Sequence, residues 1–192
     1  MYLNNLAKEI LKNVPEGISK VKFAKILYFV HKSLVLENLS EINDLKFIRM
    51  PLGPVPVGFK DLYNDKDITI EKTSGSLSYN MQIYKIVHAN SYLGSQQQQV
   101  ITSSVKSLIT FPTSELVEVS HQEPSWIKFA NGSEYFISKE DLDLALPTQK
   151  KDTLSTEIDN QRLQARLVEG MLDDIVLEST ALEYPDLELN KK

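Results

Sequence analysis

Residues 21–35 constrain the fold of this chain more than any other segment, because they are apolar around most of a helix. Tyr28 and Phe29 widen an apolar face whose members recur at helical spacing: Phe23, Ile26, Leu27, Val30, Leu34 and Val35. A helix of this kind needs other elements packed against several of its sides. The sequence therefore predicts a buried central helix, capped at its start by Ser19 and ending near Glu37.

A rigid segment follows the central helix. It reads Leu52-Gly53-Pro54-Val55-Pro56, and each proline fixes its own φ angle and holds the preceding residue in an extended conformation. We expect a sharp Gly-Pro corner beside the helix.

The remaining pattern predicts an α+β fold that is mainly helical: a compact helical domain with a small antiparallel β-hairpin or sheet, and a long C-terminal helix. The expected elements are a helix over 3–13, a helical turn over 58–63 with Phe59, Leu62 and Tyr63 facing inward, a β-hairpin from 67–72 and 79–87, a helix over 96–109, a short helix after Pro112, a brief strand over 134–137, and a helix from Ser138, with Asp141 as its capping partner, to Pro147.

The C-terminal section differs in charge and pattern from the rest. Five basic and ten acidic residues lie between Lys151 and Lys192, against totals of 21 and 26, so residues 1–150 are formally neutral. Apolar residues in this section follow a spacing of four and three, which is typical of a coiled-coil seam. We therefore expect a helical domain over 1–147 and an acidic helical arm over 148–192. The arm either docks on its own domain, pairs with a second copy or binds a partner through Leu154, Ile158, Ala165, Val168, Leu172 and Ile175.

Composition narrows the function classes. The chain has no cysteine, which excludes disulfides, thiolate metal sites and cysteine nucleophiles. It has no apolar run of the roughly 20 residues that span a bilayer, so we expect a cytoplasmic protein that does not enter a membrane. A neutral body with an acidic arm makes nucleic acid an unfavoured partner.

The histidines offer the first candidates for chemistry. His31 lies on the central helix next to Tyr28, and His88 follows a predicted strand. His121 and Glu123 form an H-x-E-P pattern like the start of the zinc deaminase signature, but the cysteine ligands of that signature are absent. The chain carries no H-E-x-x-H, G-x-S-x-G or phosphate-binding loop motif. We therefore expect no metal, no cofactor and no catalytic constellation.

Three motifs in order resemble the Panacea domain of the SocA-like antitoxins, a family found in phage-associated and mobile-element genes. They are the run Lys25 to Phe29, the Gly53-Pro54-Val55 corner after Phe47, and Ser120 to Trp126. Leu52 stands where the family usually has an aromatic residue. The resemblance implies a mainly helical domain with a small β element. Its motif residues have either a structural or a partner-binding role: Tyr28, His31, Gly53, Pro54, Val55, His121, Glu123 and Trp126.

Two functions then compete. The resemblance implies a neutralising antitoxin that binds a cognate protein toxin and, in one branch of the family, delivers it to a protease. The alternative is an enzyme that acts on a small molecule or a modified partner through a site around His121 and Glu123. A packed loop in which Trp126 is buried and His121 and Glu123 bond locally is the structural interpretation of the same residues.

Overall fold

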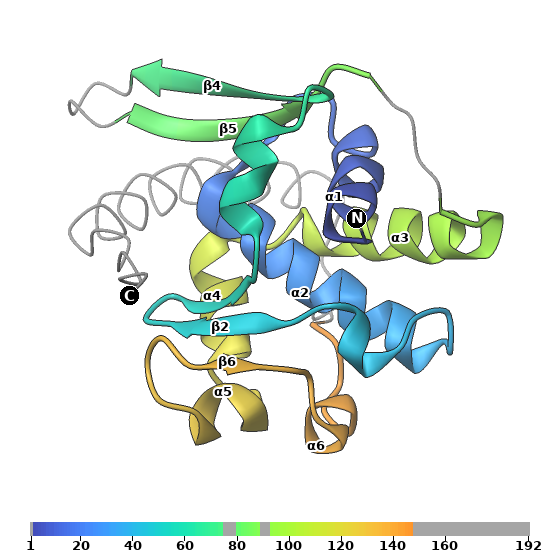
Figure 1. Ribbon diagram of the computed structural model, residues 1–192, viewed down its shortest axis with the longest axis vertical. Coiled ribbons are helices and arrows are strands. Elements are labelled where there is room, and N and C mark those ends of the chain that lie inside the picture. Colours follow the sequence, from blue (N-terminus) through green and yellow to red (C-terminus); the bar gives the residue numbers. More distant parts are fainter. Residues whose placement is uncertain (1, 75–79, 89–92, 148–192) are drawn as a thin grey trace, which may run out of the picture.

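The predicted central helix is α2 (Lys20–Leu36), which lies between two small antiparallel sheets in the computed structural model of the protein (Figure 1). The structure describes residues 2–74, 80–88 and 93–147. Every residue of α2 from Phe23 to Leu34 is buried, polar ones included. Ser19 holds the predicted N-cap position, although its side chain makes no capping hydrogen bond.

The first sheet contains the predicted hairpin and one further strand. Its order is β1 (Ile18–Ser19), β5 (Asn80–Ile86) and β4 (Ile68–Ser74). Tyr84 on β5 pairs with Ile70 on one side and Ile18 on the other, and its ring packs against Phe23 of α2 at 5.3 Å between centroids. The sheet therefore covers α2 through Tyr84.

The second sheet corrects the expected Gly-Pro corner. Residues 53–56 form a strand, β3 (Gly53–Pro56), which pairs with β2 (Phe47–Met50), and β2 pairs in turn with β6 (Glu134–Tyr135). The prolines fit a strand here because β3 is an edge strand, where a missing backbone donor is tolerated. Phe47 faces Tyr28 of α2, with ring centroids 5.0 Å apart.

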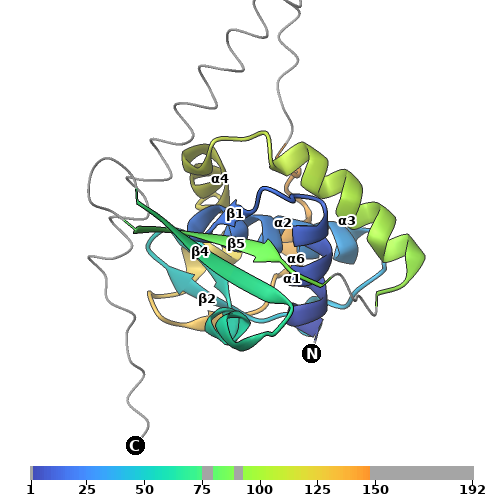
Figure 2. The same cartoon turned by 90° about the horizontal axis from the view of Figure 1, so that it is seen from above.

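Helices and short 3₁₀ segments surround α2 and the two sheets (Figure 2). They are α1 (Tyr2–Lys12), η1 (Ile42–Asp44), η2 (Phe59–Asn64), α3 (Ser95–Leu108), α4 (Thr113–Ser120), α5 (Pro124–Lys128) and α6 (Lys139–Leu142). Helices α1, α3 and α4 each pack against α2. The described residues thus confirm an α+β fold.

Some local predictions were wrong. Tyr63 does not face inward, because its side chain is 40% exposed. The last described helix begins at the predicted Ser138 and Asp141 capping box but ends at Leu142, well before Pro147. The expected C-terminal helix lies outside the described residues. Within the described part of the chain, no helix is both long enough and apolar enough to cross a membrane.

Candidate functional site

A row of polar side chains runs along the buried face of α2. Lys25, Tyr28 and Lys32 are spaced by three and four residues, which places them on one side of the helix. Their exposed fractions are 1%, 0% and 0%. Because a buried polar group is costly unless it is hydrogen-bonded, the partners of this row define the first part of the site.

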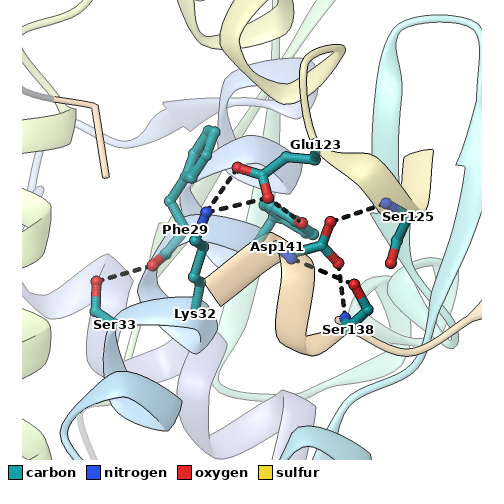
Figure 3. Close-up of polar contacts among 8 residues, drawn as sticks. Phe29, Lys32, Ser33, Glu123, Ser125, Ser138 and Asp141 are labelled. Atoms are coloured by element: carbon teal, nitrogen blue, oxygen red, sulfur yellow. Dashed lines mark hydrogen bonds and ion pairs between the residues drawn. The ribbon is translucent and has the colours of Figure 1, made fainter. Parts of the chain in front are cut away.

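Glu123 is the partner of two members of the row (Figure 3). The Lys32 Nζ atom donates to both carboxylate oxygens, at 2.8 and 3.0 Å, and the Tyr28 hydroxyl donates to Oε2 at 3.0 Å. Glu123 holds the extended N-cap position of α5, with Pro124 at the first helical position, and its side chain is 1% exposed. These contacts form a buried ion pair that joins α2 to α5 across 91 residues of sequence.

Burial controls the ionisation of this group. It raises the pKa of Glu123 because it penalises the carboxylate, an effect that the bonds from Lys32 and Tyr28 oppose. It also raises the pKa of Tyr28, and the neighbouring Glu123 carboxylate adds to that rise. Tyr28 therefore acts as a neutral hydrogen-bond donor at physiological pH.

Asp141 fixes α6 against α5 beside the ion pair (Figure 3). Its two oxygens accept hydrogen bonds from the backbone N–H groups of Ser125 at 2.8 Å and Ser138 at 2.7 Å, and its own N–H donates to the Ser138 hydroxyl at 3.2 Å. Asp141 is fully buried. Asp141, which belongs to the capping box predicted from sequence, thus also holds the start of α5 in place.

Lys25 has a different kind of partner. Its Nζ atom donates to the Pro54 carbonyl oxygen at 2.8 Å and packs under Gly53. Burial lowers its pKa from 10.5 to about 7. Unlike Lys32, Lys25 ties α2 to the β2–β3 hairpin through a neutral carbonyl rather than a carboxylate.

His121 and Trp126 lie in a stack at the end of α4 and on α5. The two rings are nearly parallel with centroids 4.0 Å apart, and the Arg49 guanidinium lies 3.9 Å from the Trp126 ring centroid. Two groups this close to one ring must occupy opposite faces, so Trp126 is sandwiched between Arg49 and His121. The Trp126 Nε1–H donates to the Met50 carbonyl at 3.1 Å.

The charged neighbours of the stack affect His121. Burial lowers its pKa, and the nearby charge of Lys25 lowers it further. Trp126 itself is half-buried rather than enclosed in the core as expected. The stack therefore joins α5 to the β2–β3 hairpin at the surface of the domain.

His31 belongs to a third arrangement. Its Nδ1 atom lies 3.1 Å from the Tyr2 hydroxyl, which is also 2.7 Å from the Ser40 hydroxyl. Burial lowers the pKa of His31 to about 4 and raises that of Tyr2 to about 12, so both groups are neutral near pH 7. They connect α1 to the loop that follows α2.

The predicted site residues are thus divided among separate contacts. Tyr28 and Glu123 meet in the core, Gly53 and Pro54 cover Lys25, and Val55 is half-buried on β3. The bonds of Glu123 lead into the core, whereas His121 stacks on Trp126, and neither residue lines the groove formed by α2, η1 and α6. The predicted arm residues are outside the described part of the chain: Leu154, Ile158, Ala165, Val168, Leu172 and Ile175.

Sequence reasoning overlooked the partners that complete these contacts. It assigned no role to Lys32 or Arg49, although a lysine in the middle of so apolar a helix is a signal that a buried acid lies elsewhere in the chain. Among the described residues, no group of three or more histidine, aspartate or glutamate side chains is placed to hold a metal ion. What the arrangement does chemically is to hold α2, α5 and the hairpin in fixed positions.

Comparison with known proteins identifies the family. The family described as "Antitoxin SocA-like, Panacea domain" matches residues 23–127, which is more than half of the 192-residue chain. No curated protein and no solved structure matches the chain. The matched region runs from the start of α2 to α5 and contains the Lys25, Tyr28 and Lys32 row, the β2–β3 hairpin and the Trp126 stack. The chain therefore belongs to the SocA-like antitoxin family that carries the Panacea domain.

Proposed function

We propose that this protein is the antitoxin of a toxin–antitoxin system and that it neutralises a cognate toxin by binding it directly in the cytoplasm. The observation that carries the proposal is the family match over residues 23–127. An antitoxin family implies a protein partner in general, and the cognate toxin is the partner proposed for this chain.

The geometry of the motif residues supports a binding role over an enzymatic one. Glu123 is 1% exposed and its carboxylate already accepts hydrogen bonds from Lys32 and Tyr28, so a substrate would first have to displace a buried ion pair. His121 is engaged with Trp126 rather than with Glu123. The motif residues therefore stabilise the domain, and a partner would bind to its outer surfaces.

The acidic section after residue 150 gives the partner a chemical character. Many toxins that act on nucleic acid or translation are basic, and ten acidic residues against five basic ones would attract such a protein over a distance. The arm then contributes mainly to the association rate, which salt should reduce.

Co-expression with the products of the adjacent genes tests the proposal. Each neighbour is expressed alone in a growth assay, and then together with this protein carrying an affinity tag. We expect one neighbour to arrest growth alone, to be silenced by this protein and to co-purify with it. If no neighbour is toxic, or if the toxic one neither binds nor is silenced, the antitoxin proposal is wrong.

A truncation after Pro147 tests the contribution of the arm. We expect the shortened protein to fold but to lose rescue of cells from the toxic neighbour. The amount of tagged toxin separates the two modes of neutralisation: it stays constant if the toxin is occluded and falls, in a protease-dependent manner, if this protein is an adaptor. Full rescue by the truncated protein would exclude the arm as the capturing element.

A further inference from the structure

A groove lies between the end of α2, the 3₁₀ segment η1 and helix α6, on the side of the domain shown at the lower right of Figure 1. Its volume is about 440 Å³, and of the residues in the polar contacts described above only Ser40, whose hydroxyl binds Tyr2, lines it. Apolar side chains from all three elements line it, namely Val35, Ile42 and Leu142, together with the polar Asn38 and Ser40 and the charged Glu41, Lys139 and Asp143. It is thus a concave surface with an apolar part and a polar part, formed by three separate elements.

The end of α2 that forms one wall is fixed by its own hydrogen bonds. Asn38 has a φ angle of 56°, in the left-handed region, and its N–H donates to the Val35 carbonyl while the Leu39 N–H donates to the Leu34 carbonyl. This pair of bonds is the Schellman ending of a helix. The Gln97 side chain of α3 also donates to the Leu39 carbonyl at 2.7 Å, so the wall is attached to the core.

The other two walls are fixed by capping boxes. In η1 the Glu41 N–H donates to the Asp44 side chain at 2.8 Å, and in α6 the Ser138 N–H donates to Asp141 at 2.7 Å. Asp141 in turn is bonded to α5 through Ser125. Walls with this many internal bonds keep the groove preformed, which lowers the entropic cost of binding a partner.

The charge around the groove is acidic. Glu41 and Asp143 line it, and three further exposed carboxylates lie within two positions of its lining residues in sequence, on Glu37, Asp44 and Glu140. Lys139 is the one cation among the lining residues. A segment with apolar side chains for the groove and basic side chains for its rim would therefore match it in both shape and charge.

We propose that this groove is the docking site for a basic, amphipathic segment of the partner toxin. The inference rests on the proposed antitoxin function and assigns a surface of the domain to it. The C-terminal section of the same chain is a poor match for an acidic rim, because it carries ten acidic residues against five basic ones. The groove and the acidic section thus attract the same kind of partner.

An NMR titration tests the groove without knowledge of the toxin. The full-length ¹⁵N-labelled protein is titrated with a synthetic amphipathic peptide of leucine and lysine, and separately with the same peptide carrying glutamate in place of lysine. We expect amide shifts at Val35, Ile42 and Leu142 with the lysine peptide and none with the glutamate peptide. Shifts located elsewhere, equal shifts with both peptides, or groove shifts caused by deleting residues 148–192 would each overturn the proposal.

A pair of charge-reversal variants extends the test to the toxin. Glu37→Lys with Asp143→Lys changes two exposed residues that follow α2 and α6, where a lysine also suits the helix dipole. The control, Glu16→Lys with Glu118→Lys, makes the same charge change at exposed positions on the α1–β1 turn and on α4. We expect the groove variant to bind the toxic neighbour at least about tenfold more weakly than the control does.

The outcomes separate this inference from the proposed function. If the unchanged protein captures the toxic neighbour and both variants bind it equally, the groove assignment is wrong and the antitoxin function stands. If the unchanged protein captures no toxic neighbour, the antitoxin function fails. In that case the peptide titration alone decides whether the groove binds basic segments.

Discussion

Two lysines are fully buried on one face of α2, and they are neutralised by different means. Lys32 faces the carboxylate of Glu123, whereas Lys25 donates to the Pro54 carbonyl, which carries no full charge. A charge buried without a counter-ion is expensive, so the Lys25 amine loses its proton easily in the folded protein. We therefore expect stability to respond differently to pH and to mutation at these two residues.

The first prediction concerns Lys25 and pH. The unfolded chain holds a proton on this amine up to about pH 10.5, whereas in the folded chain the pKa is about 7. Between these values the unfolded state binds more protons, so the free energy of unfolding should rise with pH, by up to about 1.4 kcal/mol per pH unit. Urea unfolding across this window should show the rise, and Lys25→Met should flatten it. An equal slope in the variant would assign the titration to another group.

The second prediction concerns the Lys32 and Glu123 pair. Lys32→Met and Glu123→Leu each leave a buried charge without its partner, so each should lower the free energy of unfolding by about 3 to 5 kcal/mol. The double variant removes both charges, so its free energy of unfolding should fall by much less than the sum of the losses in the two single variants. Urea denaturation of all four proteins measures this coupling. Additive losses would mean that the pair is not coupled in the folded protein.

At the scale of the secondary-structure elements, the packing of the β2–β3 hairpin depends on a single glycine. Met50 pairs with Gly53 at its turn, and Gly53 has a φ angle of +92°. A Cβ atom built on Gly53 would lie 2.3 Å from Ser120 Oγ and 2.9 Å from Lys25 Cε. The hairpin can cover Lys25 and reach α4 only because residue 53 has no side chain.

The third prediction compares two glycines with positive φ. Gly132→Ala should lower the free energy of unfolding by about 1 to 2 kcal/mol. The loss comes from backbone strain alone, because φ is +79° there and no atom lies within 4 Å of the added Cβ. Gly53→Ala should lower the free energy of unfolding by about 1 to 3 kcal/mol more than Gly132→Ala does, since it adds a steric clash to the same backbone strain. Thermal or urea unfolding measures both. Adding Ser120→Gly to Gly53→Ala should recover part of the difference, and equal losses for the two glycines would contradict the packing argument.

At the scale of the whole molecule, segments outside the family match complete the core. Strand β1 pairs with β5, strand β6 pairs with β2, Tyr2 of α1 contacts His31, and Asp141 of α6 holds the start of α5. Strands β1 and β6, Tyr2 and Asp141 all lie outside residues 23–127, whereas the partners that they contact lie inside this range. We therefore propose residues 1–147 as the folding unit, with 148–192 as a separate arm.

The fourth prediction tests this division. A fragment of residues 1–147 should unfold cooperatively, with a free energy of unfolding within about 1 kcal/mol of the full-length value, because it retains every buried element that the structure describes. A fragment of residues 23–127 should show no cooperative transition. Urea unfolding followed by circular dichroism measures both. Loss of cooperativity in the longer fragment would show that residues 148–192 belong to the core.

The sequence by itself determined the elements whose causes are local. The apolar spacing of residues 21–35 predicted α2, the alternation over residues 67–72 and 79–87 predicted the β4–β5 hairpin, and Ser138 with Asp141 predicted the start of α6. These signals work because helical periodicity, strand alternation and caps involve residues a few positions apart. The family motifs were also readable in sequence.

The tertiary structure decided which distant residues meet. Lys32 and Glu123 are 91 positions apart, Arg49 and Trp126 are joined by a bond across 77 positions, and the pairing of β2 with β6 spans a similar separation. No local pattern specifies such partners, because any buried lysine could pair with any acid that the packing brings to it. The same holds for the groove, whose three walls come from α2, η1 and α6 and adjoin only after the chain has folded around α2.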